Sequence, residues 1–254
     1  MVFKRLLASV GIGNASVDTV LSNPVLIPGD VLNGVITIRG GSVDQTIDRI
    51  DLCLETVAER EGEDIEYRQA VKILEENLFS QLQIQAGAVR EIPFQLQVPH
   101  DTPINRALGF QLPIPIYLRT HVHIAGAVDA SDRDPITVEP NKPQARILEA
   151  MRNLSCRLYK ADMEFGHIPG SRLPFFQELE FHAGPSYARF VNEIELTFVT
   201  RDQDMDVILE MDKRTTGLAR LAYSSIDEVR GFRVRYDDYS EHDWESVIEN
   251  LLMR

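Results

Sequence analysis

The chain has 254 residues, and its 39 Asp and Glu outnumber its 26 Lys and Arg, which gives a formal net charge of −13 at pH 7. Nucleic-acid binding requires a cationic surface against the phosphates, so this balance argues against DNA and RNA as partners. Hydrophobic residues make up 44% of the chain, which excludes a disordered composition and allows one large all-β unit or two domains.

The amino-terminal segment, residues 1–13, places Lys4 and Arg5 before a short apolar run that ends at Gly11. A secretory signal has a longer and stronger apolar region, and no part of the chain reaches the roughly 18 apolar residues of a membrane span. Two charges beside one short apolar patch give marginal membrane affinity. We therefore expect this segment to dock on the first domain and the protein to be cytoplasmic.

Alternation of apolar and polar residues, broken by turn residues, dominates residues 16–140 and predicts short antiparallel strands. They are expected at 16–21, 31–39, 49–55, 67–74, 91–98, 114–124 and 135–139. In 49–55, the core face takes Ile50, Leu52 and Leu54, so Cys53 falls on the face toward water. About seven strands in a stretch of this length are typical of a β-sandwich.

Two prolines, Pro140 and Pro143, mark the expected boundary between an N-terminal domain, residues 1–140, and a C-terminal domain, residues 144–254. Residues 1–140 carry 11 basic and 19 acidic residues, and the remainder carries 15 and 20. Both halves are acidic, so the net charge of the chain does not conceal a basic domain.

The second half begins and ends with helical patterns. Apolar spacing predicts a helix over 144–154 and an amphipathic helix over 242–253, with Trp244 on its apolar face and Ser240 or Asp243 as its cap. Residues 216–227 are ambiguous and would suit a short helix. Strands are expected at 157–165, 175–182, 190–199, 205–211 and 232–236. We expect a second β-sandwich with flanking helices.

Two cysteines, Cys53 and Cys156, lie far apart in a chain without a C-x-x-C motif, which argues against a disulfide framework. Neither has a recognisable partner base in the local sequence, and exposure alone does not make a thiol reactive. The chain also lacks the G-x-S-x-G and P-loop lysine motifs. No catalytic residue is predicted.

Two histidines, His121 and His123, project to one face of the strand expected at 114–124, which is a spacing by which a sheet can offer two imidazoles to a metal. No carboxylate or third histidine is placed near them in sequence, so we interpret them as part of an exposed polar face and predict no metal site. Residues 11–16 match half of a dinucleotide fingerprint, but they lack its third glycine and precede the first strand. We interpret them as a loop and predict no cofactor.

Alternating acids at residues 202–206 are similar to the opening of a calcium loop. Val207 stands where that loop requires Gly, and Lys213 stands where it requires a bidentate Glu. An acidic hairpin turn is the favoured interpretation, and weak calcium binding there or at 129–134 stays open.

A small basic cluster consists of Arg230, Arg233 and Arg235. Acidic residues follow it directly, within 237–243. We expect local neutralisation of these charges and no track for phosphates.

A family resemblance is carried by several runs along the chain: Phe3-Lys4-Arg5-Leu6-Leu7-Ala8-Ser9-Val10-Gly11-Ile12-Gly13, Pro28-Gly29, Ile38-Arg39-Gly40-Gly41-Ser42-Val43-Asp44-Gln45, Glu91-Ile92-Pro93-Phe94, Ala127-Val128-Asp129 and Leu173-Pro174-Phe175-Phe176-Gln177-Glu178. With these runs the chain resembles the bacterial sporulation-control family, stage-zero sporulation protein M. The resemblance implies an all-β fold of two consecutive arrestin-like β-sandwich domains. It implies a cytoplasmic regulatory or scaffolding role and supplies no catalytic residues.

The leading hypothesis is a non-enzymatic regulator or scaffold that works by binding other proteins through a sheet edge or an interdomain groove. The charged loop at 59–66 and the helix at 244–252 are candidate interaction elements, although packing on its own domain is favoured for the helix. The alternative is an ion- or lipid-binding sandwich, with a weak calcium site or a peripheral membrane contact. The oligomeric state stays open, with a homodimer among the alternatives.

Overall fold

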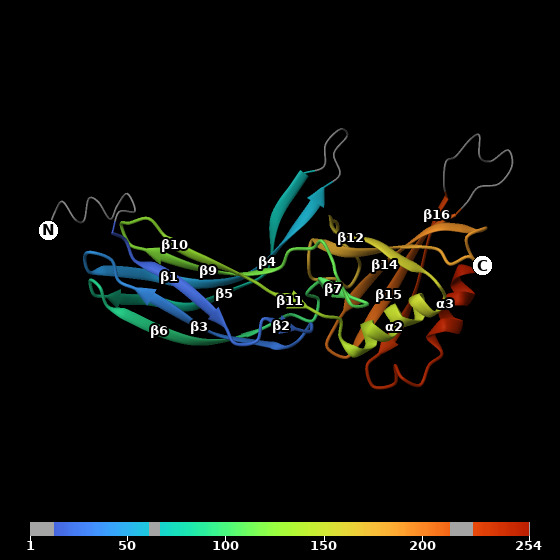
Figure 1. Ribbon diagram of the computed structural model, residues 1–254, viewed down its shortest axis with the longest axis horizontal. Coiled ribbons are helices and arrows are strands. Elements are labelled where there is room, and N and C mark those ends of the chain that lie inside the picture. The colour runs from blue at the N-terminus through green and yellow to red at the C-terminus, as the bar shows by residue number, and fades with distance from the viewer. Residues whose placement is uncertain (1–12, 61–66, 214–225, 254) are drawn as a thin grey trace. The chain divides into compact units, whose positions relative to one another are not determined.

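The computed structural model describes residues 13–60, 67–213 and 226–253 (Figure 1). The chain divides into two compact units, each built from more than one segment. Unit 1 consists of Met1–Val57, Ala70–Pro99 and Pro115–Thr137, and unit 2 of Ala58–Gln69, His100–Ile114 and Val138–Arg254. The expectations for Lys4, Arg5, the 61–66 loop and residues 216–225 lie outside the described residues.

Unit 1 is built from two sheets. One has the strand order β1 (Ser16–Leu21), β3 (Val31–Arg39) and β6 (Val89–Gln97), with antiparallel neighbours. The other has the order β10 (Ala130–Pro135), β9 (Tyr117–Ile124), β4 (Gln45–Arg60) and β5 (Tyr67–Ile84). Two short strands, β2 (Val25–Leu26) and β11 (Thr137–Val138), pair with each other.

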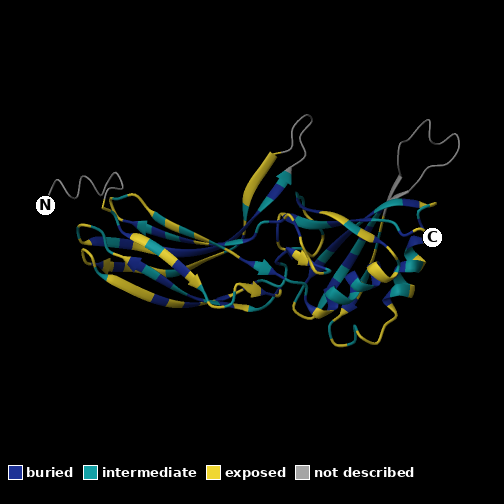
Figure 2. Ribbon diagram, in the orientation of Figure 1, coloured by how far each residue is buried: buried dark blue, intermediate teal, exposed yellow. Residues whose placement is uncertain are grey.

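Alternation of side chains places the core of unit 1 between its two sheets. Along β6, residues Ile92, Phe94 and Leu96 are buried while their neighbours are exposed, as the sequence predicts. The same alternation follows other strands of the unit (Figure 2). Between the sheets, the hydroxyls of Thr19 and Thr120 lie 2.7 Å apart in a hydrogen bond. This arrangement is the predicted β-sandwich.

Cys53 of β4 is 5% exposed, so the prediction that it faces water is wrong. Arg119 pairs with it in the register of β9, and the charges of Lys72 and Glu75 are close enough to act on its pKa. Long charged side chains therefore cover the face that alternation assigns to water. Burial, reinforced by the charge of Glu55, raises the pKa of the Cys53 thiol to about 11.

Unit 2 contains a continuous antiparallel sheet and two helices. The sheet follows chain order through β12 (Arg157–Phe165), β13 (Phe175–His182), β14 (Val191–Thr200), β15 (Asp204–Lys213) and β16 (Ile226–Arg235). A short hairpin joins β7 (Arg106–Ala107) to β8 (Phe110–Gln111). The helices are α2 (Lys142–Asn153) and α3 (Trp244–Leu252).

The helix α2 begins within the segment 140–143, where a boundary is expected, with Asn141 as its N-cap and Lys142 as its first residue. The Asn141 side chain accepts a hydrogen bond from the Gln144 backbone, and the Gln144 side chain accepts one from the Asn141 backbone. This capping box and Pro143 in the first turn favour helix formation there.

The closing helix, α3, lies where the apolar spacing predicts a helix, and Asp243 caps it through the Ser246 backbone. Its buried residues Trp244 and Ile248 lie one turn apart. The Trp244 ring stacks on Phe232 of β16 at 5.3 Å between centroids, so this apolar face packs within its own unit. In the described parts of the chain, no helix is long and apolar enough to cross a membrane.

Candidate functional site

Two clusters of side chains in the described structure have donor atoms close enough together to share a metal ion. One is formed in unit 1 by His121, His123 and Asp129, and the other in unit 2 by three carboxylates. Within each cluster, the donor atoms lie within 4.8 Å of one another. We call the first the His–Asp cluster and the second, with the residues around it, the acidic pocket.

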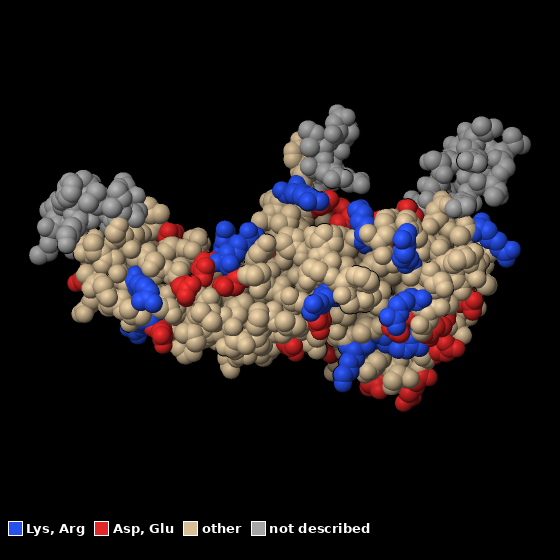
Figure 3. Space-filling model, viewed as in Figure 1, with Lys and Arg blue, Asp and Glu red and all other residues tan. Residues whose placement is uncertain are grey.

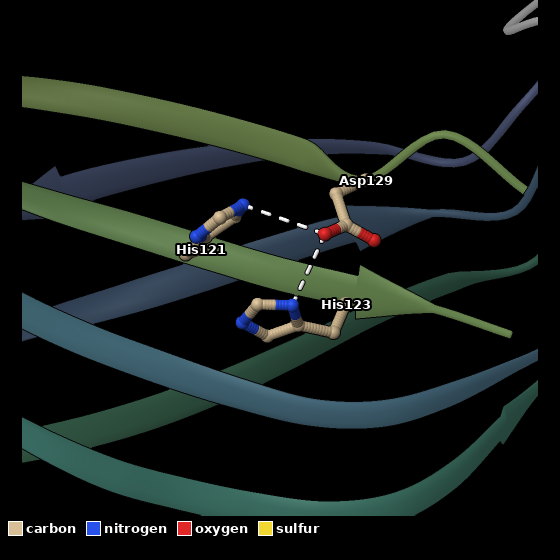
Figure 4. Close-up of side chains that lie close together, drawn as sticks. All are labelled: His121, His123 and Asp129. Atoms are coloured by element: carbon tan, nitrogen blue, oxygen red, sulfur yellow. Dashed lines mark hydrogen bonds and ion pairs between the residues drawn. The ribbon is translucent and has the colours of Figure 1, made fainter.

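The His–Asp cluster joins the end of β9 to the start of β10 (Figure 4). His121 and His123 stand on the same face of β9, and Ala130 of β10 pairs with Val122 between them. Asp129, one residue before Ala130, thereby lies beside both imidazoles. Its Oδ2 is 3.0 Å from His123 Nδ1 and 3.6 Å from His121 Nε2.

Further hydrogen bonds hold the cluster in place. Asp129 Oδ1 accepts a hydrogen bond of 2.9 Å from the Ile124 backbone, which fixes the orientation of the carboxylate. On the other side of the imidazole ring, His123 Nε2 lies 3.0 Å from Asp51 Oδ2. Asn77 donates to Asp51 Oδ1 at 3.0 Å, and Arg49 Nε donates to Oδ2 at 2.6 Å.

Electrostatic effects of opposite sign act on this cluster. Burial raises the pKa of Asp51, but hydrogen bonds from Asn77, Arg49 and His123 outweigh it and hold the pKa below its usual value. Burial and the neighbouring His123 lower the pKa of His121, although Asp129 opposes them. The Asp51 carboxylate therefore stays ionised, and the His121 imidazole favours its neutral form.

The sequence predicts the two histidines on one face, but the expectation of no nearby carboxylate is wrong. Asp129 is only six residues after His123, and the chain reverses between them with Gly126 at φ +65°. A hairpin returns each residue after the turn to the side of a residue before it. Recognising the Ala125-Gly126-Ala127 turn would have placed Asp129 at the cluster.

The acidic pocket is an open cavity of about 830 Å³ over β12 and β13. Its lining includes Lys160, Asp162, Glu164, Glu178, Glu180 and Glu195. The register places Asp162 opposite Glu178, and Lys160 opposite Glu180. Lys160 Nζ lies 2.6 Å from both Asp162 and Glu180, so one ammonium group serves two carboxylates.

Charge in this pocket is only partly balanced. Asp162 Oδ1 is buried and makes no hydrogen bond within the described structure. Burial, together with the charges of Glu195 and Asp162, raises the pKa of Glu178 to about 8. The two carboxylates that flank Lys160 raise the pKa of its ammonium. At neutral pH the pocket holds a cationic lysine and a largely protonated Glu178.

Of the acids at 202–206, Asp202 lies in the hairpin turn between β14 and β15, and Asp204 and Asp206 belong to the first residues of β15. Arg201 binds Asp204 at 2.8 Å and Asp206 at 2.5 Å, and Arg233 binds Asp206 at 2.7 Å. Arg235 binds Asp237 at 2.6 Å, so acids neutralise these arginines locally. Figure 3 shows basic and acidic side chains interspersed on the face of unit 2 that it presents.

Residues 129–134, the other acidic run, do not act as one group. Asp129 belongs to the His–Asp cluster, whereas Asp132 Oδ2 accepts a hydrogen bond from the Thr19 backbone at 2.6 Å. Burial and the charges of Asp132 and Asp18 raise the pKa of Asp134 to about 6. Asp132 and Asp134 share one face of β10, whereas Asp129 precedes the strand and lies beside the histidines of β9.

The described structure is that of a β-rich protein of two units, each with one cluster of side chains that could hold a metal ion. A family model described as SpoOM protein matches residues 3–215. The sporulation-control protein spo0M of Bacillus subtilis is 35% identical over 251 residues, with 98% of this chain and 95% of the relative covered. The crystal structure of Spo0M from Bacillus subtilis matches with a TM-score of 0.83 at 30% identity, covering 95% of this chain and 98% of that one. The chain therefore belongs to the SpoOM family, and its fold is arrestin-like.

Proposed function

We propose that the protein is a non-enzymatic, cytoplasmic regulator in sporulation control that acts by binding other proteins. Its membership of a family whose Bacillus subtilis relative is named a sporulation-control protein supports the regulatory part of this proposal. A fold does not specify a function by itself, so the binding part rests on a particular surface of unit 1.

That surface is the outer edge of β5, the observation that carries the proposal. Among the described strands, β5 pairs with β4 alone, so one of its two backbone edges has no neighbouring strand. Most side chains within 70–84 are exposed, and Phe79 presents 41% of its surface to solvent. A long edge strand offers a row of N–H and C=O groups to an added strand.

The occupant that fits such an edge is an extended segment of a partner protein. Main-chain hydrogen bonds to β5 would supply affinity, and side chains along the strand would supply specificity. Phe79 favours an apolar residue of the partner, and the charged residues Lys72, Glu75 and Glu76 favour polar residues around it. Charged residues on an edge also oppose uncontrolled pairing with another copy of the same sheet.

Two adjacent proline substitutions test this edge. Successive N–H groups of a strand point to opposite sides, so one of Glu75→Pro and Glu76→Pro removes an outward N–H and the other removes a bond to β4. We expect one variant to keep the thermal stability of the parent chain and the other to lose about 3 kcal/mol.

The stable proline variant is then compared with the alanine variant at the same position, which keeps the N–H. Partners are identified by crosslinking in the native cells followed by mass spectrometry. Proline should abolish crosslinks that alanine preserves. Equal crosslinking of both variants would exclude the β5 edge, and the absence of any specific protein crosslink would exclude binding as the mode of action.

The regulatory role has its own test. Expression of this chain in Bacillus subtilis cells that lack their Spo0M should restore the number of heat-resistant spores, and the stable proline variant should not. Equal spore numbers with and without this chain would contradict a role in sporulation control.

A further inference from the structure

We propose that His121, His123 and Asp129 bind a divalent transition-metal ion of the Zn²⁺ class. The three ligands lie in unit 1 on β9 and the turn that follows it, and none of them belongs to β5, so the two proposals are tested separately. Two imidazole nitrogens and one carboxylate oxygen form a donor set that proteins use for such ions.

The spacing of the three donor atoms fits one ion. Two ligands bound to tetrahedral zinc at bond lengths of about 2.0–2.1 Å lie roughly 3.3 Å apart. Asp129 Oδ2 lies 3.0 Å from the Nδ1 atom of His123 and 3.6 Å from the Nε2 atom of His121, on either side of that value. All three atoms converge on the same space in front of β9 (Figure 4). The three donor atoms lie within 4.8 Å of one another, so binding would require the two imidazoles to adjust their positions around the ion.

The residues that hydrogen-bond to the proposed ligands are also of the kind found around metal sites. A histidine that binds a metal through one nitrogen commonly donates a hydrogen bond from the other to a carboxylate, which fixes the ring. His123 directs Nδ1 toward the cluster and Nε2 toward Asp51, at 3.0 Å. Asp51 is buried and is itself held by Asn77 and Arg49. The Asp129 carboxylate is also held in place, because its other oxygen, Oδ1, accepts a hydrogen bond from the Ile124 backbone N–H.

Two other histidines show what a simple surface pair looks like. His100 lies 3.6 Å from Asp202, and His242 lies 3.7 Å from Asp238. Each is one imidazole facing one exposed or half-exposed carboxylate, without the second imidazole that His121 supplies. These pairs provide an internal comparison for the experiment.

The donor set also selects the kind of ion. Calcium and magnesium prefer oxygen ligands, whereas imidazole suits zinc and its neighbours among the transition metals. Three protein ligands leave one position of a tetrahedral ion for water or for a donor from another molecule. The side chains of His121 and Asp129 are about two-fifths exposed, so that position faces solvent.

The direct test is titration of the tag-free, metal-stripped full chain with Zn²⁺ by calorimetry, with Co²⁺ as a spectroscopic probe. We expect one ion per chain, visible absorption bands of low-symmetry bound Co²⁺, and a rise in Tm with Zn²⁺ that Ca²⁺ and Mg²⁺ do not produce. Absence of saturable Zn²⁺ binding, or equal stabilisation by Ca²⁺, would overturn the proposal.

Variants then locate the ion. His121→Ala and Asp129→Asn should each weaken Zn²⁺ binding at least tenfold, while the matched control His242→Ala leaves it unchanged. Asn at 129 keeps an oxygen for the Ile124 N–H, so the turn should stay folded, which circular dichroism checks. Asp51→Asn should weaken binding about 10–100-fold without abolishing the Co²⁺ bands.

A loss of binding in His242→Ala equal to that in His121→Ala would place the ion elsewhere and refute the site. The stable β5 proline variant should bind Zn²⁺ as the parent chain does. Failure of zinc binding and failure of partner binding are therefore separate results.

Discussion

The His–Asp cluster of unit 1 and the acidic pocket of unit 2 arise from the same sequence pattern, with polar residues at positions i and i+2 of a strand. On β9 this pattern aligns His121 with His123, and on β12 it aligns Asp162 with Glu164. The cross-strand neighbours then decide the chemistry. Asp129 brings a carboxylate to two imidazoles, whereas β13 brings more carboxylates to a face that is already acidic.

The two clusters consequently balance their charge in different ways. In the acidic pocket, the Lys160 ammonium lies where a cation would be needed, 2.6 Å from both Asp162 and Glu180. The His–Asp cluster instead offers two imidazoles to an ion and has a buried carboxylate, Asp51, behind His123. The comparison indicates that the residue opposite a polar pair determines whether a strand face can take up an ion or already contains its counter-charge.

In the comparison of the two clusters, the largest expected effect on stability comes from removing the Lys160 ammonium. Lys160→Ala leaves the buried carboxylates of Asp162 and Glu180 without their shared partner, which should lower the free energy of unfolding by about 2 kcal/mol. The loss is smaller than for a fully buried pair because the Lys160 side chain is half exposed. Urea denaturation measures it.

Lys72→Ala is the matched control for this change. Lys72 pairs with Glu75 on the surface at 2.5 Å, with both side chains about half exposed, so its removal should cost under about 0.5 kcal/mol. If both lysine variants lose the same stability, Lys160 does not act as the counter-charge of the pocket.

A smaller effect is expected from Glu178, and it depends on pH. The pKa of about 8 in the folded state lies above the ordinary value of 4.5, so the folded protein binds the extra proton. The contribution of this group to the free energy of unfolding is fully present below about pH 4.5. It declines as the pH rises and is lost above about pH 8. Glu178→Gln is neutral throughout, so it should raise Tm by about 2–4 °C at pH 9 and leave it unchanged at pH 5.

Glu241→Gln makes the same chemical change at an exposed position of unit 2 and serves as the control. It should not change Tm differently at the two pH values. A pH-independent effect of Glu178→Gln, or a lower Tm at pH 9, would show that Glu178 is ionised in the folded protein at neutral pH.

Period-two alternation predicted most of the long strands of both units, because each of these strands has one face toward a core, but it missed β10 and the first residues of β16. Ile92 and Phe94 are buried as that pattern requires, and the apolar spacing from Trp244 predicts α3. The candidate sites depend instead on which strands are neighbours and in which register. Asp51 of β4 contacts His123, and Asn77 of β5 donates to Asp51; nothing in the local sequence of β9 indicates either residue.

Cys53 shows a second limit of the alternation argument. The pattern correctly separates the two faces of β4 but does not report what covers the outer face. Arg119 and Lys72 are long enough to shield a small thiol while their own charges stay in water. Polar surroundings in the sequence are therefore compatible with a buried side chain.

The smallest expected effect is a change in the alkylation rate of Cys53 when unit 2 is destabilised, which measures how strongly the stabilities of the two units are coupled. Cys53 and Cys156 are buried thiols, one in each unit, and burial raises the pKa of both, so neither should react while its unit is folded. If each unit opens by itself, Lys160→Ala should speed the alkylation of Cys156 about 30-fold, as a loss of 2 kcal/mol implies. The rate at Cys53 should change less than about twofold.

Mass spectrometry of the two cysteine peptides after timed alkylation measures both rates in one sample. Equal acceleration at Cys53 and Cys156 would show that the units open together, and the two clusters would then share one stability. With unequal rates, Zn²⁺ provides the converse experiment, because an ion bound at the His–Asp cluster should slow Cys53 and leave Cys156 unchanged. Each thiol thus reports on the cluster in its own unit, which turns the comparison between the clusters into two separately measurable quantities.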